Sequence, residues 1–266
     1  MILSRTDWEA TQPTAPTKQD RIASQYVSDL IASSDVTRAN TPQGGLAPQF
    51  PVSGEENDLV LVDLRGLSYD DPTWDALLNK LKFDDAELYR KLLFQAAYQT
   101  GALPEIQKPS STELDGPQGL TRPDTSGRNW IKDVCAYPCA PVLASTWNQP
   151  MLYELGAMIA QEALLKDING WYAPGLNLIR SPFCGRTSEY FSEDPMLAGL
   201  LGAQLVSGAG DNGLYCAIKH LCLMETEAHR SPTTCNWLTE QALREIYLKP
   251  FELVIKRAYK TIRYEP

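Results

Sequence analysis

Between residues 72 and 96 the apolar side chains recur every three or four positions, which is the spacing of one helical face. This pattern predicts two consecutive helices. Pro72 suits the first turn of the first helix, and Asp84 with Glu87 forms a capping-box pattern at the start of the second. The apolar positions are Trp74, Leu77, Leu78 and Leu81 in the first helix and Leu88, Leu92 and Ala96 in the second.

From about residue 111, short apolar runs alternate with longer helical patterns. The runs predicted as strands are TELDG at 112–116, CAPVLAS at 139–145, WYAPGLNLI at 171–179 and LYCAIKH at 214–220. The helices between and after them are predicted to open at Asn148, at Asp194 with Pro195, and at Thr239, with Pro250 interrupting the last one. Short strands that alternate with helices indicate parallel βα units, about four of them.

Residues 1–57 differ from the rest of the chain. They are rich in proline, threonine, glutamine and glycine, and one amphipathic stretch, RIASQYVSDLIASS at 21–34, interrupts them. Such a composition is typical of an extended arm or inter-domain linker. The sequence therefore predicts a division into an arm, residues 1–57, and a folded α/β part, residues 58–266.

Composition narrows the functional classes. Of the 266 residues, 43% are apolar and 21% charged, which is typical of a globular protein and excludes a fibre or wholesale disorder. The net charge of −9 repels phosphate backbones, so a nucleic-acid partner is not expected. No apolar run is long enough to span a bilayer, and the N-terminus, MILSRTDWE, does not read as a signal peptide. The expected compartment is the cytoplasm, without a membrane partner.

The cysteines are expected to be free thiols, buried or in loops. A metal site is an open alternative, because Cys216, His220, Cys222, His229 and Cys235 are close in sequence. Their spacing fits no common zinc pattern, so neither a metal nor another cofactor is expected. The chain also lacks a GxSxG motif and a phosphate-binding loop with its lysine.

Polar residues follow three of the predicted strands. Asp115 ends the first, Arg186 lies in the loop after the third, and Lys219 and His220 end the fourth. Because ligands of parallel α/β proteins bind at the carboxyl ends of the strands, these side chains are expected to converge. One carboxylate acceptor and three donors suit a polyhydroxylated ligand.

Each of these residues also has a purely structural interpretation. Asp115 could cap the Gly-Pro turn that follows it. Arg186 could pair with Glu189 or Glu193 and organise its loop. The lysine could be solvated at a strand end, and the histidine could be a semi-buried side chain with satisfied hydrogen bonds.

Long stretches of the chain resemble glycoside hydrolase family 3, the family of β-glucosidases and related exo-acting enzymes. The stretches are LDGPQG at 114–119, CAYPCAPVLASTWN at 135–148, GWYAPGLNLIRSPFCGRTSEYFSEDPMLAG at 170–199, AIKHL at 217–221 and EQALREIYLKPFELVIK at 240–256. The resemblance begins near residue 59 and implies the first half of a TIM-type (β/α) barrel. The opening LSRTDWEATQPTAP is similar to the linker ahead of the barrel in members with inverted domain order.

The resemblance implies that Asp115, Arg186, Lys219 and His220 hold the non-reducing terminal sugar, a β-glucoside or short oligosaccharide. The family is retaining, with an aspartate nucleophile and a glutamate acid/base. The family's nucleophile motif, similar to VSDW, is not in this sequence, and no catalytic residue is assigned. Met224 and His229 stand where the family tends to carry asparagines that support the sugar-binding loop, whereas Glu227 and Arg230 match the family.

Three functions follow from this pattern. The chain is expected to be part of a retaining β-glucosidase-like hydrolase, inactive or nearly so in isolation. The alternatives are a non-catalytic carbohydrate-binding or interaction half-barrel and a truncated, inactive fragment. A half-barrel leaves two raw sheet edges, and the apolar side chains of its third and fourth strands were they to face the barrel would meet water, so a homo-oligomer or a complementing barrel half is expected.

Overall fold

The computed structural model describes residues 53–83, 85–94, 98–122, 131–227, 230, 236 and 238–258. The helices are α2 (Thr73–Asn79), α3 (Ala86–Phe94), α4 (Ala140–Ala144), α5 (Gln149–Leu165), α6 (Pro195–Asp211), α8 (Glu240–Ala242) and α9 (Lys249–Ala258). The strands are β1 (Gln99–Thr100), β2 (Ser111–Asp115), β3 (Gly170–Tyr172) and β4 (Tyr215–Cys216). Short helical turns are Leu61–Leu64, Pro104–Ile106 and Thr187–Glu189, and a π-helical turn, Leu243–Tyr247, joins α8 to α9.

The four strands form one sheet in the order β1-β2-β3-β4. Strands β2, β3 and β4 are parallel, with Leu114 opposite Trp171 and Trp171 opposite Cys216, whereas β1 is antiparallel to β2. A helix follows each parallel strand, so the described chain is an α/β structure of the partial (β/α) barrel type. The predicted fold class is confirmed.

One predicted strand is wrong. The run 139–145 contains α4, and its Pro141 lies in the first turn of that helix. Proline cannot donate to a strand ladder but is well tolerated where a helix begins. The sheet gains its fourth strand from β1, which the sequence analysis did not predict.

The predicted helix starts are confirmed at three places. The side chain of Asn148 accepts a hydrogen bond from the main-chain N–H of Met151 at the start of α5. Asp194 caps α6 in the same way, and Thr239 caps α8. Each side chain satisfies one N–H that has no partner within its helix.

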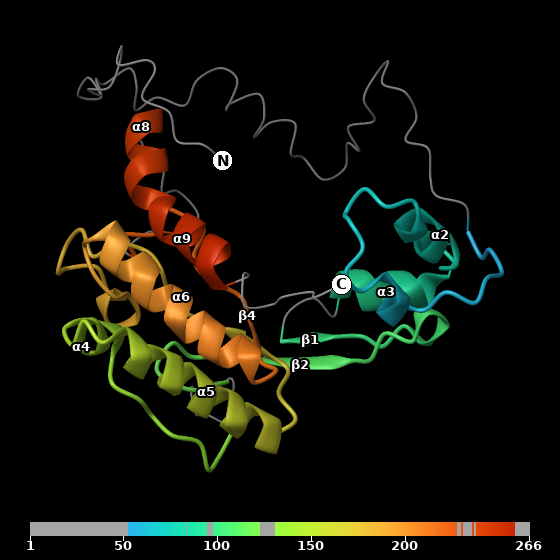
Figure 1. The fold of residues 1–266 in the computed structure, drawn as a ribbon, viewed down its shortest axis with the longest axis horizontal. Coiled ribbons are helices and arrows are strands. Elements are labelled where there is room, and N and C mark those ends of the chain that lie inside the picture. Colours follow the sequence, from blue (N-terminus) through green and yellow to red (C-terminus); the bar gives the residue numbers. More distant parts are fainter. Residues whose placement is uncertain are drawn as a thin grey trace.

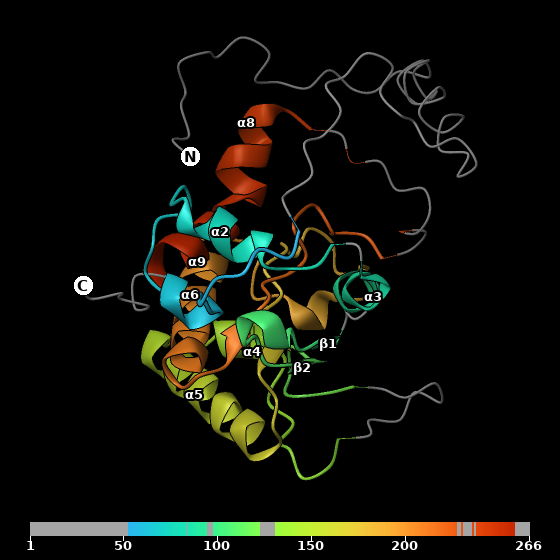
Figure 2. The same ribbon diagram turned by 90° about the vertical axis from the view of Figure 1, so that its right-hand side faces the viewer.

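The main core lies between the sheet and the helices. Leu114 and Trp171 are fully buried on one face of the sheet and belong to the same apolar cluster as Leu152 of α5 and Leu201 of α6. Helix α6 lies between α5 and α9 (Figure 1). Figure 2 shows the same helices from the side, with β1 and β2 next to them. None of the described helices is long and apolar enough to cross a membrane.

The opposite face of the sheet is polar. Strand pairing places Glu113, Asp115, Tyr172 and Tyr215 on this face. Leu176 and Leu178, which follow β3, are 0% and 1% exposed. The expectation that apolar side chains of the predicted third strand would meet water is therefore wrong.

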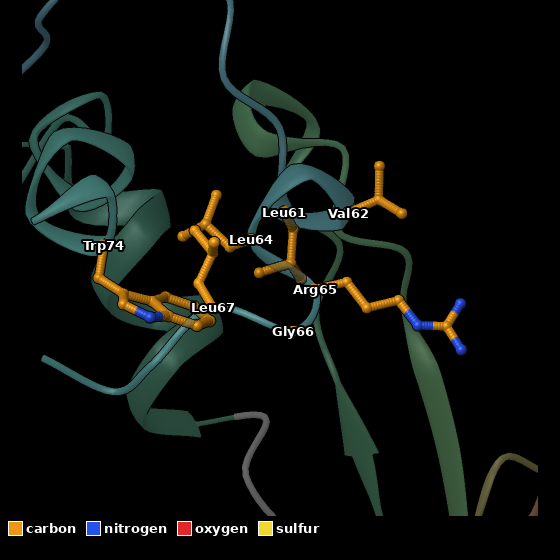
Figure 3. A pocket seen from close by; sticks show the side chains of 7 residues that line it. All are labelled: Leu61, Val62, Leu64, Arg65, Gly66, Leu67 and Trp74. Atoms are coloured by element: carbon orange, nitrogen blue, oxygen red, sulfur yellow. The ribbon is translucent and has the colours of Figure 1, made fainter. Parts of the chain in front are cut away.

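A smaller core precedes the sheet. Leu64, Leu77, Leu81, Leu88, Leu103 and Ile106 are buried together in it. Figure 3 shows the hollow of about 400 Å³ beside this core, where Trp74 faces Leu64 and Leu67 while the Arg65 side chain points away. Residues 53–57 belong to this part, since Gly54 N–H bonds to the Leu81 carbonyl and Asn57 to that of Ala76. The rest of the predicted arm lies outside the described residues, as do Asp84 and Ala96.

Candidate functional site

The ends of β2 and β4 bring Asp115 and Lys219 together. The lysine Nζ donates to Asp115 Oδ1, and the exposed fractions of the two side chains are 14% and 33%. Asp115 Oδ1 also accepts the N–H of Gly116, at 2.8 Å, so the carboxylate caps its own turn as well. Both interpretations of Asp115 thus hold at once, and the lysine is paired rather than solvated.

Arg186 and Glu189 form a second ion pair next to the first. Arg186 lies just before the short helical turn that ends with Glu189, so the two side chains face each other. Nε and Nη2 of the arginine lie 2.7 Å from the two carboxylate oxygens, and this pairing raises the pKa of the arginine. Glu189 Oε2 is also 3.9 Å from Lys219 Nζ, which connects the two pairs.

His220 completes the group. Its Nε2 lies 3.0 Å from Arg186 Nη2, and its Nδ1 lies 3.4 Å from the Tyr190 hydroxyl. Burial and the neighbouring charges of Arg186 and Lys219 lower the pKa of His220 to about 4. The imidazole is therefore neutral at pH 7 and accepts a hydrogen bond from the arginine.

The structure brings all four predicted residues into one cluster at the carboxyl ends of β2 and β4. Sequence reasoning considered Glu189 only as a partner of Arg186 and missed its approach to Lys219. The buried Asn177 and Tyr190, which both contact His220, were missed as well. Their only sequence signal is that they flank or lie within the long loop after β3.

The loop after the fourth strand also reaches the site. Met224 is buried, and its sulfur lies 3.8 Å from Arg186 Nη1. Glu227 lies 3.9 Å from the same nitrogen and 3.0 Å from Nε of Arg230. The methionine that replaces a family asparagine is thus packed against the central arginine. His229 lies outside the described residues.

A layer of polar side chains lies below Asp115 on the same face of the sheet. Glu113 is 7% exposed, and its two carboxylate oxygens accept hydrogen bonds from the Tyr172 and Tyr215 hydroxyls. Burial and this carboxylate raise the pKa of Tyr172 to about 12. The glutamate links β2, β3 and β4 through side chains, and sequence reasoning did not predict it.

The thiols do not assemble into a site. Five cysteines are free in the described chain, with Cys135 exposed and the others partly buried, while Cys235 is not described. Among the residues that the structure describes, no group of three histidine, cysteine or acidic side chains could hold a metal ion.

The geometry suits recognition of hydroxyl groups. Asp115 and Glu189 are acceptors and Lys219 and Arg186 are donors, all within one network at the strand ends. A hollow of about 390 Å³ adjoins the network, lined by residues 116–121, 134–136 and 188–189. A neutral histidine adds a group that can both accept and donate. This arrangement on a partial (β/α) barrel defines the class of sugar-binding barrel proteins.

The family follows from a direct comparison. The model of the glycosyl hydrolase family 3 N terminal domain matches residues 110–262. The chain belongs to this family, as its sequence motifs indicate.

Curated relatives and solved structures agree with the assignment. Beta-glucosidase A of Butyrivibrio fibrisolvens is 39% identical over 156 residues, which are 59% of this chain and 18% of the relative. Beta-glucosidase 3B from Thermotoga neapolitana, in complex with alpha-D-glucose, has a TM-score of 0.55 and 35% identity over 60% of this chain and 22% of its own. The beta-glucosidase from Kluyveromyces marxianus in complex with glucose has a TM-score of 0.61 and 31% identity, covering 69% and 21% of the two chains. The chain therefore spans about a fifth of the length of these relatives.

Proposed function

We propose that this chain is part of a retaining β-glucosidase-like glycoside hydrolase that acts on terminal β-linked sugars. Asp115, Arg186, Lys219 and His220 hold the terminal sugar in this proposal. The observation that carries it is the single hydrogen-bonded network that these four side chains form at the strand ends. Two related structures with bound glucose support the choice of a glucose-like ligand.

The division of tasks within the site follows from the charges. Asp115 accepts hydrogen bonds from two sugar hydroxyls, and Lys219 and Arg186 donate to hydroxyl oxygens. In the structure the Lys219 ammonium is bound to Asp115, so a hydroxyl inserted between them exchanges one charge-assisted bond for two. Both partners are needed for this exchange.

We expect Asp115→Asn and Lys219→Met each to weaken glucose binding by at least about tenfold, since each removes a charge-assisted hydrogen bond of about 1.5–3 kcal/mol. Isothermal titration calorimetry on the full chain measures this. The matched control is Lys166→Met, which removes an exposed pair with Asp133 at 3.8 Å and is expected to leave binding unchanged. Unchanged affinity in both site variants would contradict the proposed sugar contacts.

The polypeptide of residues 1–266 is expected not to hydrolyse aryl β-glucosides above background. Catalysis in this class needs a carboxylate nucleophile and a carboxylic acid, and the described acidic side chains near the site have other partners. Asp194 caps α6, Glu227 binds Arg230, and Glu189 binds Arg186. A chromogenic aryl glucoside assay tests this, and turnover that disappears in Asp194→Ala or Glu227→Ala would show that a catalytic pair is present after all.

We also propose that the chain associates, either with a second copy or with a complementing barrel half. The support is the edge strand β4, which pairs only with β3 in the described chain and leaves main-chain groups of its other edge open to pairing. Light scattering is expected to give at least a dimer for the full chain and a smaller association for a deletion of residues 1–50. A compact monomer in both would contradict the proposal.

A further inference from the structure

The carboxamide of Asn177 extends the hydrogen-bond ladder between two strand ends. After β3 and β4 the main chains stay parallel for a few residues, with Lys219 N–H bonded to the Pro174 carbonyl at 3.0 Å and Leu176 N–H to the Lys219 carbonyl at 2.6 Å. The next rung is not main chain to main chain. His220 N–H bonds to Asn177 Oδ1 at 2.7 Å, and Asn177 Nδ2 bonds to the His220 carbonyl at 2.9 Å.

The side chain therefore replaces a peptide group. An asparagine carboxamide has one acceptor and two donor hydrogens, like the combined C=O and N–H of a neighbouring strand. It reaches across where the two main chains separate, and it keeps both polar groups of His220 satisfied at that point. The separation is needed for the strand ends to open into a site.

Asn177 is almost inaccessible, at 2% exposed. Its amide also lies against the carboxyl group of Glu225 on the loop after the fourth strand. A buried amide is stable only when its hydrogen bonds are made, because each lost bond leaves a buried polar group at a cost of about 1–3 kcal/mol. The position thus requires an asparagine for its hydrogen bonds and not for its volume.

We propose that Asn177 is the positioning residue of the sugar site: by holding the main chain of His220 from both sides, it directs Lys219 toward Asp115 and His220 toward Arg186. This inference rests on the proposed function for its effect on sugar, but the positioning itself concerns only this chain. Asn177 does not touch the ligand in this proposal.

The ring of His220 supports the same assignment. Arginine can only donate, so the 3.0 Å contact with Arg186 Nη2 makes His220 Nε2 the acceptor. The proton of the neutral ring then lies on Nδ1, which is 3.3 Å from Asn177 Oδ1 and 3.4 Å from the Tyr190 oxygen. The same oxygen of Asn177 thus faces both the main-chain N–H and the ring N–H of His220.

The charges around the ring make its position measurable. Arg186 and Lys219 lower the pKa of His220, together with burial, while Glu189 and Asp115 act in the opposite direction with smaller effect. A ring that leaves this place loses burial and the contact with the arginine. Its pKa then rises toward the ordinary value of about 6.5.

Histidine resonances report this directly, since the chain contains only two histidines. In a His229→Gln background, the imidazole proton signal of His220 is expected not to titrate between about pH 5.5 and 8, because its pKa lies well below this range. Asn177→Ala is expected to make the signal titrate with a midpoint above about pH 5.5 and to weaken glucose binding by at least about tenfold.

The control variant is Asn212→Ala, which removes a 2.9 Å bond from another asparagine side chain to the Gly208 carbonyl at the end of α6. It is expected to lower stability without changing the His220 titration or the affinity for glucose. A general loss of stability would therefore not reproduce the result of Asn177→Ala.

An unchanged His220 titration in folded Asn177→Ala would overturn the proposal. If circular dichroism shows that this variant does not fold, Asn177→Asp decides instead. It keeps an acceptor for His220 and loses the donor, and a carboxylate next to Nδ1 is expected to raise the pKa of the histidine above about 5.5 and weaken glucose binding; a signal that still does not titrate overturns the proposal. Absence of glucose binding to the unsubstituted chain would refute the proposed function, while the titration would still decide the role of Asn177.

Discussion

Gly208→Ala is expected to lower the free energy of unfolding by about 3 kcal/mol or more, a large loss for a single methyl group. A Cβ atom at Gly208 in α6 would lie 1.9 Å from the main-chain oxygen of Tyr153 in α5. The contact is reciprocal, because a Cβ at Gly156 in α5 would lie 2.1 Å from the Leu205 oxygen in α6. Main-chain atoms on both sides cannot yield as a flexible side chain would, so the two helices would have to separate.

Gly210→Ala is the matched control for this effect. It introduces the same methyl group in the same helix, but no atom lies within 4 Å of the added Cβ. Alanine is the better helix former by about 1 kcal/mol, so this variant is expected to be as stable as the original chain or slightly more stable. Urea unfolding followed by circular dichroism compares the two. Equal stability of Gly208→Ala and Gly210→Ala would show that the helices are not packed this closely.

The sequence predicted the helices well because each carries a local signal. The caps Asn148, Asp194 and Thr239 act within three residues of themselves, so their role can be read without knowledge of the fold. The close approach of α5 and α6 has no such signal. Gly156 and Gly208 are 52 positions apart in the printed sequence, and their importance depends on which carbonyl the other helix presents.

The strands were harder to predict. A short apolar run fits a buried strand and a buried helical segment equally well, and 139–145 proved to be helical because its proline opens a turn. Strand β1 has two residues, and only its pairing with Thr112 and Ser111 defines it. Pairing is a long-range property, which propensity along the chain does not contain.

The location of the candidate site was predictable from topology. Residues at the carboxyl ends of parallel strands meet, and Asp115 and Lys219 do so although 104 positions separate them. The residues that hold the site in place were not predictable in this way. Asn177 acts through the main chain of His220, and Glu189 acts through Lys219 as well as Arg186, so both depend on tertiary contacts.

The glutamate has the larger electrostatic role of the two. Glu189 receives both guanidinium nitrogens of Arg186 at 2.7 Å and lies 3.9 Å from Lys219, and about 80% of its side chain is shielded from solvent. Replacing it with glutamine leaves two cations 3.9 Å or more from the remaining carboxylate of Glu227 or bound to Asp115 alone. Partly buried charges without a nearby counter-ion are strongly unfavourable.

Glu189→Gln is therefore expected to lower the free energy of unfolding by about 2 kcal/mol and to weaken glucose binding, since Arg186 is no longer held. Glu87→Gln is the matched control: Glu87 binds Arg90 three residues later with the same pair of 2.7 Å contacts, but both side chains are about half exposed. Solvent screens that pair, so its loss is expected to cost less than about 0.5 kcal/mol and to leave glucose binding unchanged. Urea unfolding and calorimetry on the two variants measure the difference, and equal losses of stability would mean that Glu189 is no more than a surface ion-pair partner of Arg186.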